Sequence, residues 1–354
     1  MKKIHILIAI ALLTLTSCKV DFSPNAPWRD VPAVYCILDP DEDTVWARVQ
    51  RCYLGEENLY NYSSIPDSNY YLPNDITVHL LAYEGVRGPY NSLSSTGRLR
   101  DRWQFTYTER PGKPEGNFPS GLQPVYYCVP GRQLVADSDC VYQLLIIRNS
   151  SGDTLARANT TMVGYRERSI HLRDTVEEIL VRPNHLNGHH FHFTRGESKM
   201  DWNPVPRGRR YQPIITFYYK HLRDTCSITI PGNVKAASGT MDLISNALVI
   251  SESRFLSIIK NQLKDNKDTL FSVNNVDITI SVCNEDLNAY INSLDRTVMG
   301  GQETPTFSNV DGGVGIFASR RNHITVNIPA DSFGNPTNLP QRLVDLGVGF
   351  YGNF

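Results

Sequence analysis

The segment HLNGHHFHF holds the densest group of possible metal ligands in the sequence, with His185, His189, His190 and His192 in one short stretch. Neutral imidazole is the commonest metal ligand in proteins, and alternate residues such as His190 and His192 share one face of a strand. No Asp, Glu or Cys lies within the stretch to complete a coordination shell. The pattern is more typical of a polar strand beside a turn, so we predict no metal ligand and no cofactor.

The segment DPDEDT offers a second possible cation site, because Asp39, Asp41 and Asp43 alternate as they do at the start of an EF-hand loop. That loop needs Gly at its sixth position and Glu at its twelfth. Thr44 and Gln50 stand there instead. The segment therefore predicts an acidic hairpin turn.

A group of tyrosines in NLYNYSSIPDSNYY is the best candidate for ligand binding. Tyr60, Tyr62, Tyr70 and Tyr71 lie in a polar segment, and tyrosine offers a large contact area together with a hydroxyl group. Such residues could stack on a sugar ring or fill a protein interface. The alternative is that half of them fold back and pack against the domain.

No segment matches a motif of enzyme chemistry. Glycine-rich GVRGPY and DGGVG fit neither the Rossmann nor the P-loop spacing, and the sequence contains no GxSxG and no HExxH. We therefore assign no catalytic residue and expect a protein that is not an enzyme.

Cys18 stands where an apolar N-terminal run gives way to polar sequence. Lys2 and Lys3 precede a short apolar stretch from Ile6 to Leu15, which is the order of a secretory signal. The stretch is shorter than the roughly 20 apolar residues of a membrane span. Leu15-Thr16-Ser17-Cys18 resembles the bacterial lipobox, in which the cysteine is acylated after the preceding peptide is cleaved. Residues 1–17 are thus predicted to be a lipoprotein signal peptide, and two or three acyl chains on Cys18 would hold the protein on a membrane.

Residues 18–30 are predicted to be a lipidated tether, stiffened by Pro24 and Pro27 within it and by Pro32 just after it. A polyproline-like chain of this length reaches roughly 40 Å, so the folded part should lie close to the lipid. Removal of Lys2 and Lys3 takes the formal charge from −1 to −3. A nearly neutral chain gives no electrostatic reason to expect nucleic acid as a partner.

Short β-rich runs separated by turn residues predict a mostly β protein made of two β-sandwich domains of immunoglobulin or fibronectin type. The N-terminal domain would span residues 31–167 and the C-terminal β-rich domain residues 168–354. The predicted strands include Val31–Leu38, Thr44–Leu54, Asp75–Tyr83, Trp103–Thr108, Val125–Val129, Cys140–Ile147, Thr154–Val163, Tyr211–Tyr219, Val273–Val282, Val314–Ser319 and Ile324–Ile328.

Two short helices are expected within the C-terminal domain. Phe255, Ile259 and Leu263 are four residues apart between Arg254 and Leu263. The second helix follows Asn284, a favourable capping residue, and carries an apolar stripe that is more typical of a core than of a cofactor site.

The six cysteines after Cys18 belong to a compartment that permits disulfides. A hairpin centred on Asp41 places Cys36 opposite a residue near Trp46, so Cys36 and Cys52 would lie too far apart to be bridged. Cys128 and Cys140 flank a predicted loop and form the better candidate pair.

Several segments together resemble one family of Bacteroidota lipoproteins, known as domain of unknown function 4249. These segments are VYCILDPDEDTVWARVQRCYLGEENLY, DSNYYLPNDITVHL and DLNAYINSL...TFSNVDGGVGIFASR, and the likeness runs from about Val31 to Arg320. Its most specific part is Phe307 to Arg320, where Gly312 and Gly313 allow φ > 0 and a close approach of the backbone. The resemblance implies an outer-membrane lipoprotein that often accompanies a TonB-dependent transporter, and it brings no catalytic residues.

These observations lead to the hypothesis of a lipid-anchored accessory or binding protein of the outer membrane, with an envelope protein such as a TonB-dependent transporter as its partner. The alternative is a surface adhesin or fimbria-like structural subunit. Some Bacteroidota surface lipoproteins carry an acidic cluster just after the acylated cysteine. Here only Asp21 is acidic in that position, so the sequence assigns the protein to neither face of the outer membrane.

Overall fold

The computed structural model of the protein shows a mostly β fold with sandwich-like layers, as the sequence predicts. The residues that it describes are 30–52, 65, 69–89, 92–111, 121–131, 139–164, 182–183, 191, 193, 196–202, 205–236, 246–297, 307–329 and 339–351. Cys18, Tyr60, Tyr62 and the four histidines of HLNGHHFHF lie outside them.

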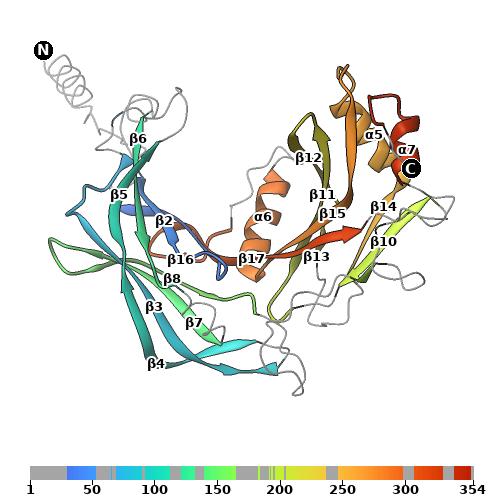
Figure 1. Ribbon diagram of the computed structural model, residues 1–354. Coiled ribbons are helices and arrows are strands. Elements are labelled where there is room, and N and C mark those ends of the chain that lie inside the picture. The colour runs from blue at the N-terminus through green and yellow to red at the C-terminus, as the bar shows by residue number, and fades with distance from the viewer. Residues whose placement is uncertain are drawn as a thin grey trace, which may run out of the picture.

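One nine-stranded sheet runs through the whole molecule (Figure 1). Its path follows the order β12-β11-β15-β17-β1-β2-β6-β5, and β13 pairs with β11 beside this path. The bounds are β12 (Asp224–Pro231), β11 (Arg210–His221), β15 (Leu270–Cys283), β17 (Val314–Pro329), β1 (Val31–Leu38), β2 (Val45–Cys52), β6 (Leu122–Cys128), β5 (Thr106–Pro111) and β13 (Lys235–Ala236).

A five-stranded sheet covers one face of the N-terminal half of this sheet and completes a sandwich. Its order is β16 (Val310–Asp311), β8 (Thr154–Thr161), β7 (Cys140–Arg148), β3 (Ile76–Arg87) and β4 (Leu93–Gln104). Val34 and Leu38 of β1 face Leu80 of β3 and Leu144 of β7 in one buried cluster. Strict alternation along β1 therefore leaves Tyr35 and Ile37 on the opposite face of the large sheet.

A second core lies under the C-terminal half of the large sheet. It includes residues of α5 (Glu252–Gln262), α7 (Leu339–Asp345) and a three-stranded sheet in the order β14-β10-β9. The bounds of these strands are β14 (Asn246–Ser251), β10 (Glu197–Trp202) and β9 (Arg182–Pro183). Phe255 of α5 contacts Phe191, Phe193 and Phe217 with ring centroids 5.4–6.0 Å apart, which fixes the helix against the sheet.

The two predicted helices are confirmed, and α6 (Glu285–Thr297) begins as expected after Asn284. The Asn284 side chain accepts a hydrogen bond from the backbone N–H of Leu287 at 3.2 Å, which is an N-cap contact. Leu287 packs with Ile316 and Ala318 on the face of β17 that points away from the N-terminal core. The helix therefore lies on the exposed face of the large sheet, near its middle (Figure 1). The third helix, α7, was not expected.

Strand β17 joins the two halves of the chain. Its first residues pair in parallel with β1, and its later residues pair antiparallel with β15, so the two strands predicted at Val314–Ser319 and Ile324–Ile328 are one. Gly315 has φ +116°, and a Cβ there would overlap the carbonyl oxygen of Val34. Glycine is therefore required where β17 meets β1. The predicted division at residues 167 and 168 stays a prediction, and the large sheet takes strands from both sides of it.

Two details of the N-terminal half differ from expectation. The predicted strand Trp103–Thr108 is divided at Phe105, which is buried and donates its backbone N–H to Val78, so the chain passes there from one sheet to the other. The predicted Cys128–Cys140 disulfide is wrong, since both residues are free cysteines in the interior and belong to different sheets. Cys36 does lie opposite Ala47, next to Trp46, as the hairpin geometry required.

Candidate functional site

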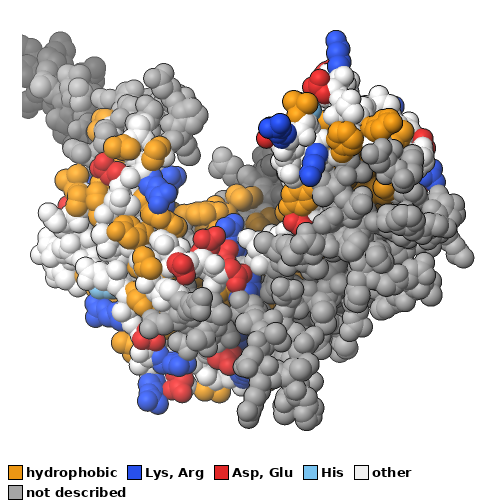
Figure 2. Space-filling model, in the orientation of Figure 1, with side chains coloured by type: hydrophobic (Ala, Val, Ile, Leu, Met, Phe, Trp, Pro, Cys, Tyr) orange, Lys and Arg blue, Asp and Glu red, His pale blue; other side chains and the backbone are white. Residues whose placement is uncertain are grey.

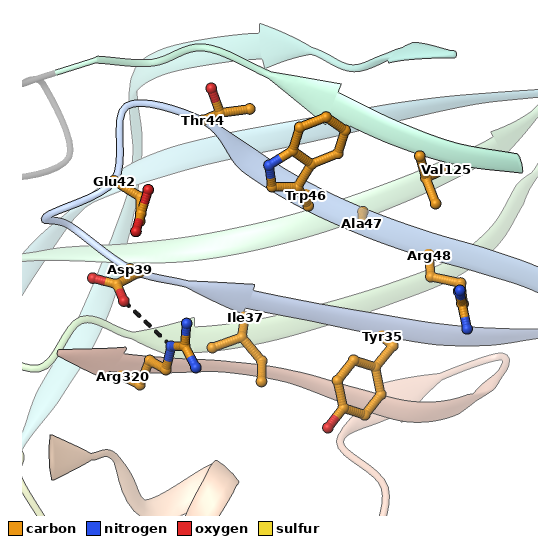
Figure 3. A pocket seen from close by; sticks show the side chains of 10 residues that line it. All are labelled: Tyr35, Ile37, Asp39, Glu42, Thr44, Trp46, Ala47, Arg48, Val125 and Arg320. Atoms are coloured by element: carbon orange, nitrogen blue, oxygen red, sulfur yellow. Dashed lines mark hydrogen bonds and ion pairs between the residues drawn. The ribbon is translucent and has the colours of Figure 1, made fainter. Parts of the chain in front are cut away.

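The face of the large sheet that points away from the N-terminal core forms an open groove. Figure 2 shows a hollow between the part of the molecule that carries β5 and β6 and the part that carries β12 and β15. The groove has a volume of about 530 Å³. Its lining comes from β1, β2, β6, β17 and the β1–β2 turn and consists of Tyr35, Ile37, Asp39, Glu42, Thr44, Trp46, Ala47, Arg48, Val125 and Arg320 (Figure 3).

Trp46 is the largest side chain in the groove. It is on β2 and keeps 37% of its surface exposed. Its ring lies 5.4 Å from that of Tyr127 on β6, and the guanidinium carbon of Arg110 on β5 stands 3.9 Å from the centre of the indole. Both neighbours hold the indole in place, the second through a cation–π contact.

Arg48 lies on the same face of β2, two residues beyond Trp46. Its guanidinium donates to the side-chain carbonyl of Gln123 at 2.8 Å. Tyr35 is its direct cross-strand partner on β1 and has 45% of its surface exposed. An aromatic side chain and a guanidinium thus lie side by side on the floor of the groove.

The acidic turn closes one end of the groove. Asp39 is buried and lies 3.2 Å from Arg320, and Asp41 lies 2.9 Å from the fully buried Arg321. Burial raises the pKa of Asp39 above its ordinary value, although the Asp41 backbone N–H and Arg320 oppose the shift. These carboxylates bind arginines of β17, so the predicted hairpin turn is confirmed and its role is to fasten the turn to the sheet.

The predicted tyrosine site is only partly within the described residues. Tyr70 and Tyr71 are buried, with exposed fractions of 7% and 1%, so both pack against the sandwich. The Tyr71 hydroxyl donates to Asp30 at 2.8 Å, and Arg51 lies 4.7 Å above its ring. The packing alternative therefore holds for this half of the set, while binding by Tyr60 and Tyr62 stays a prediction.

A second, smaller pocket of about 360 Å³ lies where β8 meets the start of α6. Thr160 donates to the Asp286 carboxylate at 2.7 Å and receives a hydrogen bond from Asn284 at the same distance. Burial raises the pKa of Asp286, and the hydrogen bonds from Thr160, Asn309 and Asn284 oppose the shift. These hydrogen bonds connect β8 with the start of α6, so the polar residues of this pocket have a structural role.

Sequence reasoning missed the groove because its residues are ordinary members of strands. Tyr35, Trp46 and Arg48 occupy alternate positions of two predicted strands, and these positions point outward. Large aromatic residues at solvent-facing positions were the available signal. Arg110 could not have been added, since nothing local places β6 between β5 and β2.

Within the described ranges, no three His, Cys, Asp or Glu side chains gather so that they could hold a metal ion. In that same part of the chain, no helix is long and apolar enough to cross a membrane.

Comparison with known proteins yields no family. No family model and no curated protein matches the chain. It is similar to two solved structures titled cytokine receptor complex, crystal forms 1A and 2, with TM-scores of 0.22 and 0.19 and identities of 9% and 8%. The matches cover 84% and 70% of this chain and 97% and 90% of the matched chains. Since similarity this low carries no argument, the conclusions below depend on the groove and the sequence.

Proposed function

We propose that this protein is a binding protein without enzymatic activity, anchored to the outer membrane through acylated Cys18. Its groove on the large sheet would receive an envelope partner, such as a TonB-dependent transporter or the cargo of one. The observation that carries the proposal is the open groove with Tyr35, Trp46 and Arg48 on its floor. Aromatic and arginine side chains are the residues most enriched where proteins recognise partners.

The chemistry of the groove favours binding over catalysis. The Asp39 carboxylate is occupied by Arg320, and Arg48 is bonded to the amide of Gln123. Both contacts hold side chains in fixed positions, which lowers the entropic cost of recognition.

The contacts that hold the residue before β1 in place are consistent with a protein anchored through its N-terminus. Asp30 precedes β1 and is held by Arg148, by Arg51 at 3.4 Å and by the Tyr71 hydroxyl. The Asp30 side chain is only 5% exposed. A pull on the tether would therefore meet a buried ionic network before it reached β1. The lipobox and the resemblance to domain of unknown function 4249 support the same proposal.

The adhesin or fimbria-like alternative is less favoured. Such subunits assemble by exchange of a strand at a sheet edge. Strand β1 pairs with β2 on one side and β17 on the other, so its release would open the core of the sandwich.

Two experiments test the proposal in cells that express the full chain. Cys18→Ser should release the protein from the membrane fraction, and continued membrane association of this variant would argue against the anchor. A photo-crosslinking amino acid at position 35 should give adducts with an outer-membrane protein, whereas the same group at the exposed Arg157, on the other sheet, is the control. Equal adducts at both positions, or adducts that persist after Trp46→Ala, would argue against the groove as the binding site.

A further inference from the structure

We infer that the groove recognises an oxyanion, a carboxylate or phosphate group of its ligand, through Arg48 and Arg110 beside Trp46. This inference rests on the proposed function and names the chemistry of the ligand. Arg48 and Trp46 are on β2 and Arg110 is on β5, while Gln123 is on β6, the strand between them.

The two arginines lie on the same face of the large sheet, on strands that flank β6. Arg110 is the direct cross-strand partner of Gln123, so the two side chains share a face of the sheet. Arg48 reaches across from β2 and donates to that same Gln123 side chain. Trp46 lies on this face as well and contacts Arg110.

Neither guanidinium is neutralised. Within the described part of the chain, no carboxylate lies within 4.0 Å of Arg48 or Arg110, whereas Arg320, Arg148 and Arg157 each have one. The carboxylate next to Arg110 in sequence, Glu109, accepts a hydrogen bond from Tyr107 and alternates to the other face of β5. Two positive charges on one face of the sheet without a counter-charge attract an anion.

The contacts that hold the two arginines leave donors for a ligand. A guanidinium has five N–H donors in one plane. Arg48 uses one of them on Gln123, and the contact of Arg110 with the indole is a cation–π contact that uses up no N–H donor in a hydrogen bond. The edge of a guanidinium matches the two oxygens of a carboxylate or a phosphate.

The test uses the purified chain with Cys18→Ser, titrated by calorimetry with citrate and, separately, with inorganic pyrophosphate. Potassium chloride at equal ionic strength is the control for general screening. We expect one of the two anions to bind with a dissociation constant on the order of 1 mM or tighter. The anion that binds more tightly tells a carboxylate ligand from a phosphate ligand.

Variants locate the site. Arg48→Gln and Arg110→Gln should each weaken binding roughly tenfold, which is the loss of one charge-assisted hydrogen bond. Arg48→Lys keeps the charge and should lose less. Arg157→Gln removes an exposed arginine of the other sheet that is paired with Asp311, and it should leave binding unchanged. Thermal unfolding of each variant confirms that it is folded.

The inference is overturned if neither anion binds, or if Arg48→Gln and Arg110→Gln bind as the parent does. In that case the crosslinks at position 35 still decide the proposed function independently, because they do not depend on the charge of the ligand.

Discussion

Replacement of Gly315 by alanine tests how β17 joins the two halves of the molecule. Gly315 has φ +116°, and an added Cβ would overlap the Val34 carbonyl oxygen and lie 2.9 Å from its carbonyl carbon. A non-glycine residue in so sparsely populated a region costs about 1–3 kcal/mol. An extra carbon forced between packed elements costs about 1–3 kcal/mol more. The free energy of unfolding should therefore fall by about 2–6 kcal/mol, a large part of the usual total of about 5–15 kcal/mol.

Urea unfolding followed by circular dichroism measures this loss. The matched control is Gly152→Ala in the β7–β8 hairpin, where φ is +76° and no atom lies within 4 Å of the added carbon. That change carries the backbone cost alone, about 1–2 kcal/mol. If both variants lost the same free energy, the close approach of β17 to β1 would not be what requires glycine at position 315.

Three further predictions concern buried polar groups. Because burial raises the pKa of Asp286 above its ordinary 3.8, the folded state binds this proton more tightly than the unfolded state. The contribution of Asp286 to stability is therefore full below pH 3.8 and is lost as the pH rises through the pKa of the folded state. Over that range of pH the free energy of unfolding of Asp286→Asn should rise relative to that of the parent. A constant difference in the free energy of unfolding between the two proteins at every pH would contradict this. Asp30→Ala leaves Arg51 and Arg148 without their shared carboxylate and should lower the free energy of unfolding in urea by about 2–4 kcal/mol, since both arginines are mostly buried. Tyr71→Phe removes only one hydrogen bond to Asp30 and should cost about 1 kcal/mol, so a smaller loss for Asp30→Ala than for Tyr71→Phe would show that the ionic network does not stabilise the fold. Burial raises the pKa of the Cys283 thiol to about 11 and that of Cys128 to about 12, so neither should react with a thiol reagent at pH 8 until the protein unfolds.

Periodicity predicted most of the fold because burial follows it closely. Val34, Cys36 and Leu38 alternate with exposed or half-buried residues along β1, and the apolar stripe of α6 faces β17. Strand β4 was predicted only at its last two residues, Trp103 and Gln104, because the rest of its sequence, LSSTGRLRDR, is mostly polar and exposed. It is held by its ladder to β3 and by pairs such as Arg98 with Glu84, which are interactions between distant segments. The groove was missed for the same reason, since it exists only when β5, β6, β2 and β1 lie side by side.

The residues that carry the resemblance to domain of unknown function 4249 have a clear structural role. The Asn309 side chain donates to the Phe317 carbonyl at 2.7 Å and accepts from the Phe317 N–H at 2.9 Å, which holds the segment before β17 against that strand. Ser319 is fully buried and donates to the Thr161 carbonyl at 2.8 Å, which fastens β17 to the end of β8. Gly315 adds the close contact of β17 with β1. We call these contacts of Asn309, Gly315 and Ser319 the joint.

Two of the three groove residues lie in another segment that carries the resemblance, VYCILDPDEDTVWARVQRCYLGEENLY, and Arg110 lies outside the segments quoted for it. Trp46 and Arg48 are on β2, and Arg110 is on β5, the last strand of the large sheet. Proteins that share the joint and differ at positions 46, 48 and 110 should keep the shape of the groove and bind different molecules. Exchange of both Arg48 and Arg110 for glutamine should leave the free energy of unfolding in urea within about 1 kcal/mol of the parent, because Arg110 is exposed and Arg48 is half-buried on the outer face of the sheet. The same exchange should weaken anion binding roughly a hundredfold. A larger loss of stability would place these arginines in the framework of the sheet and not in a recognition site.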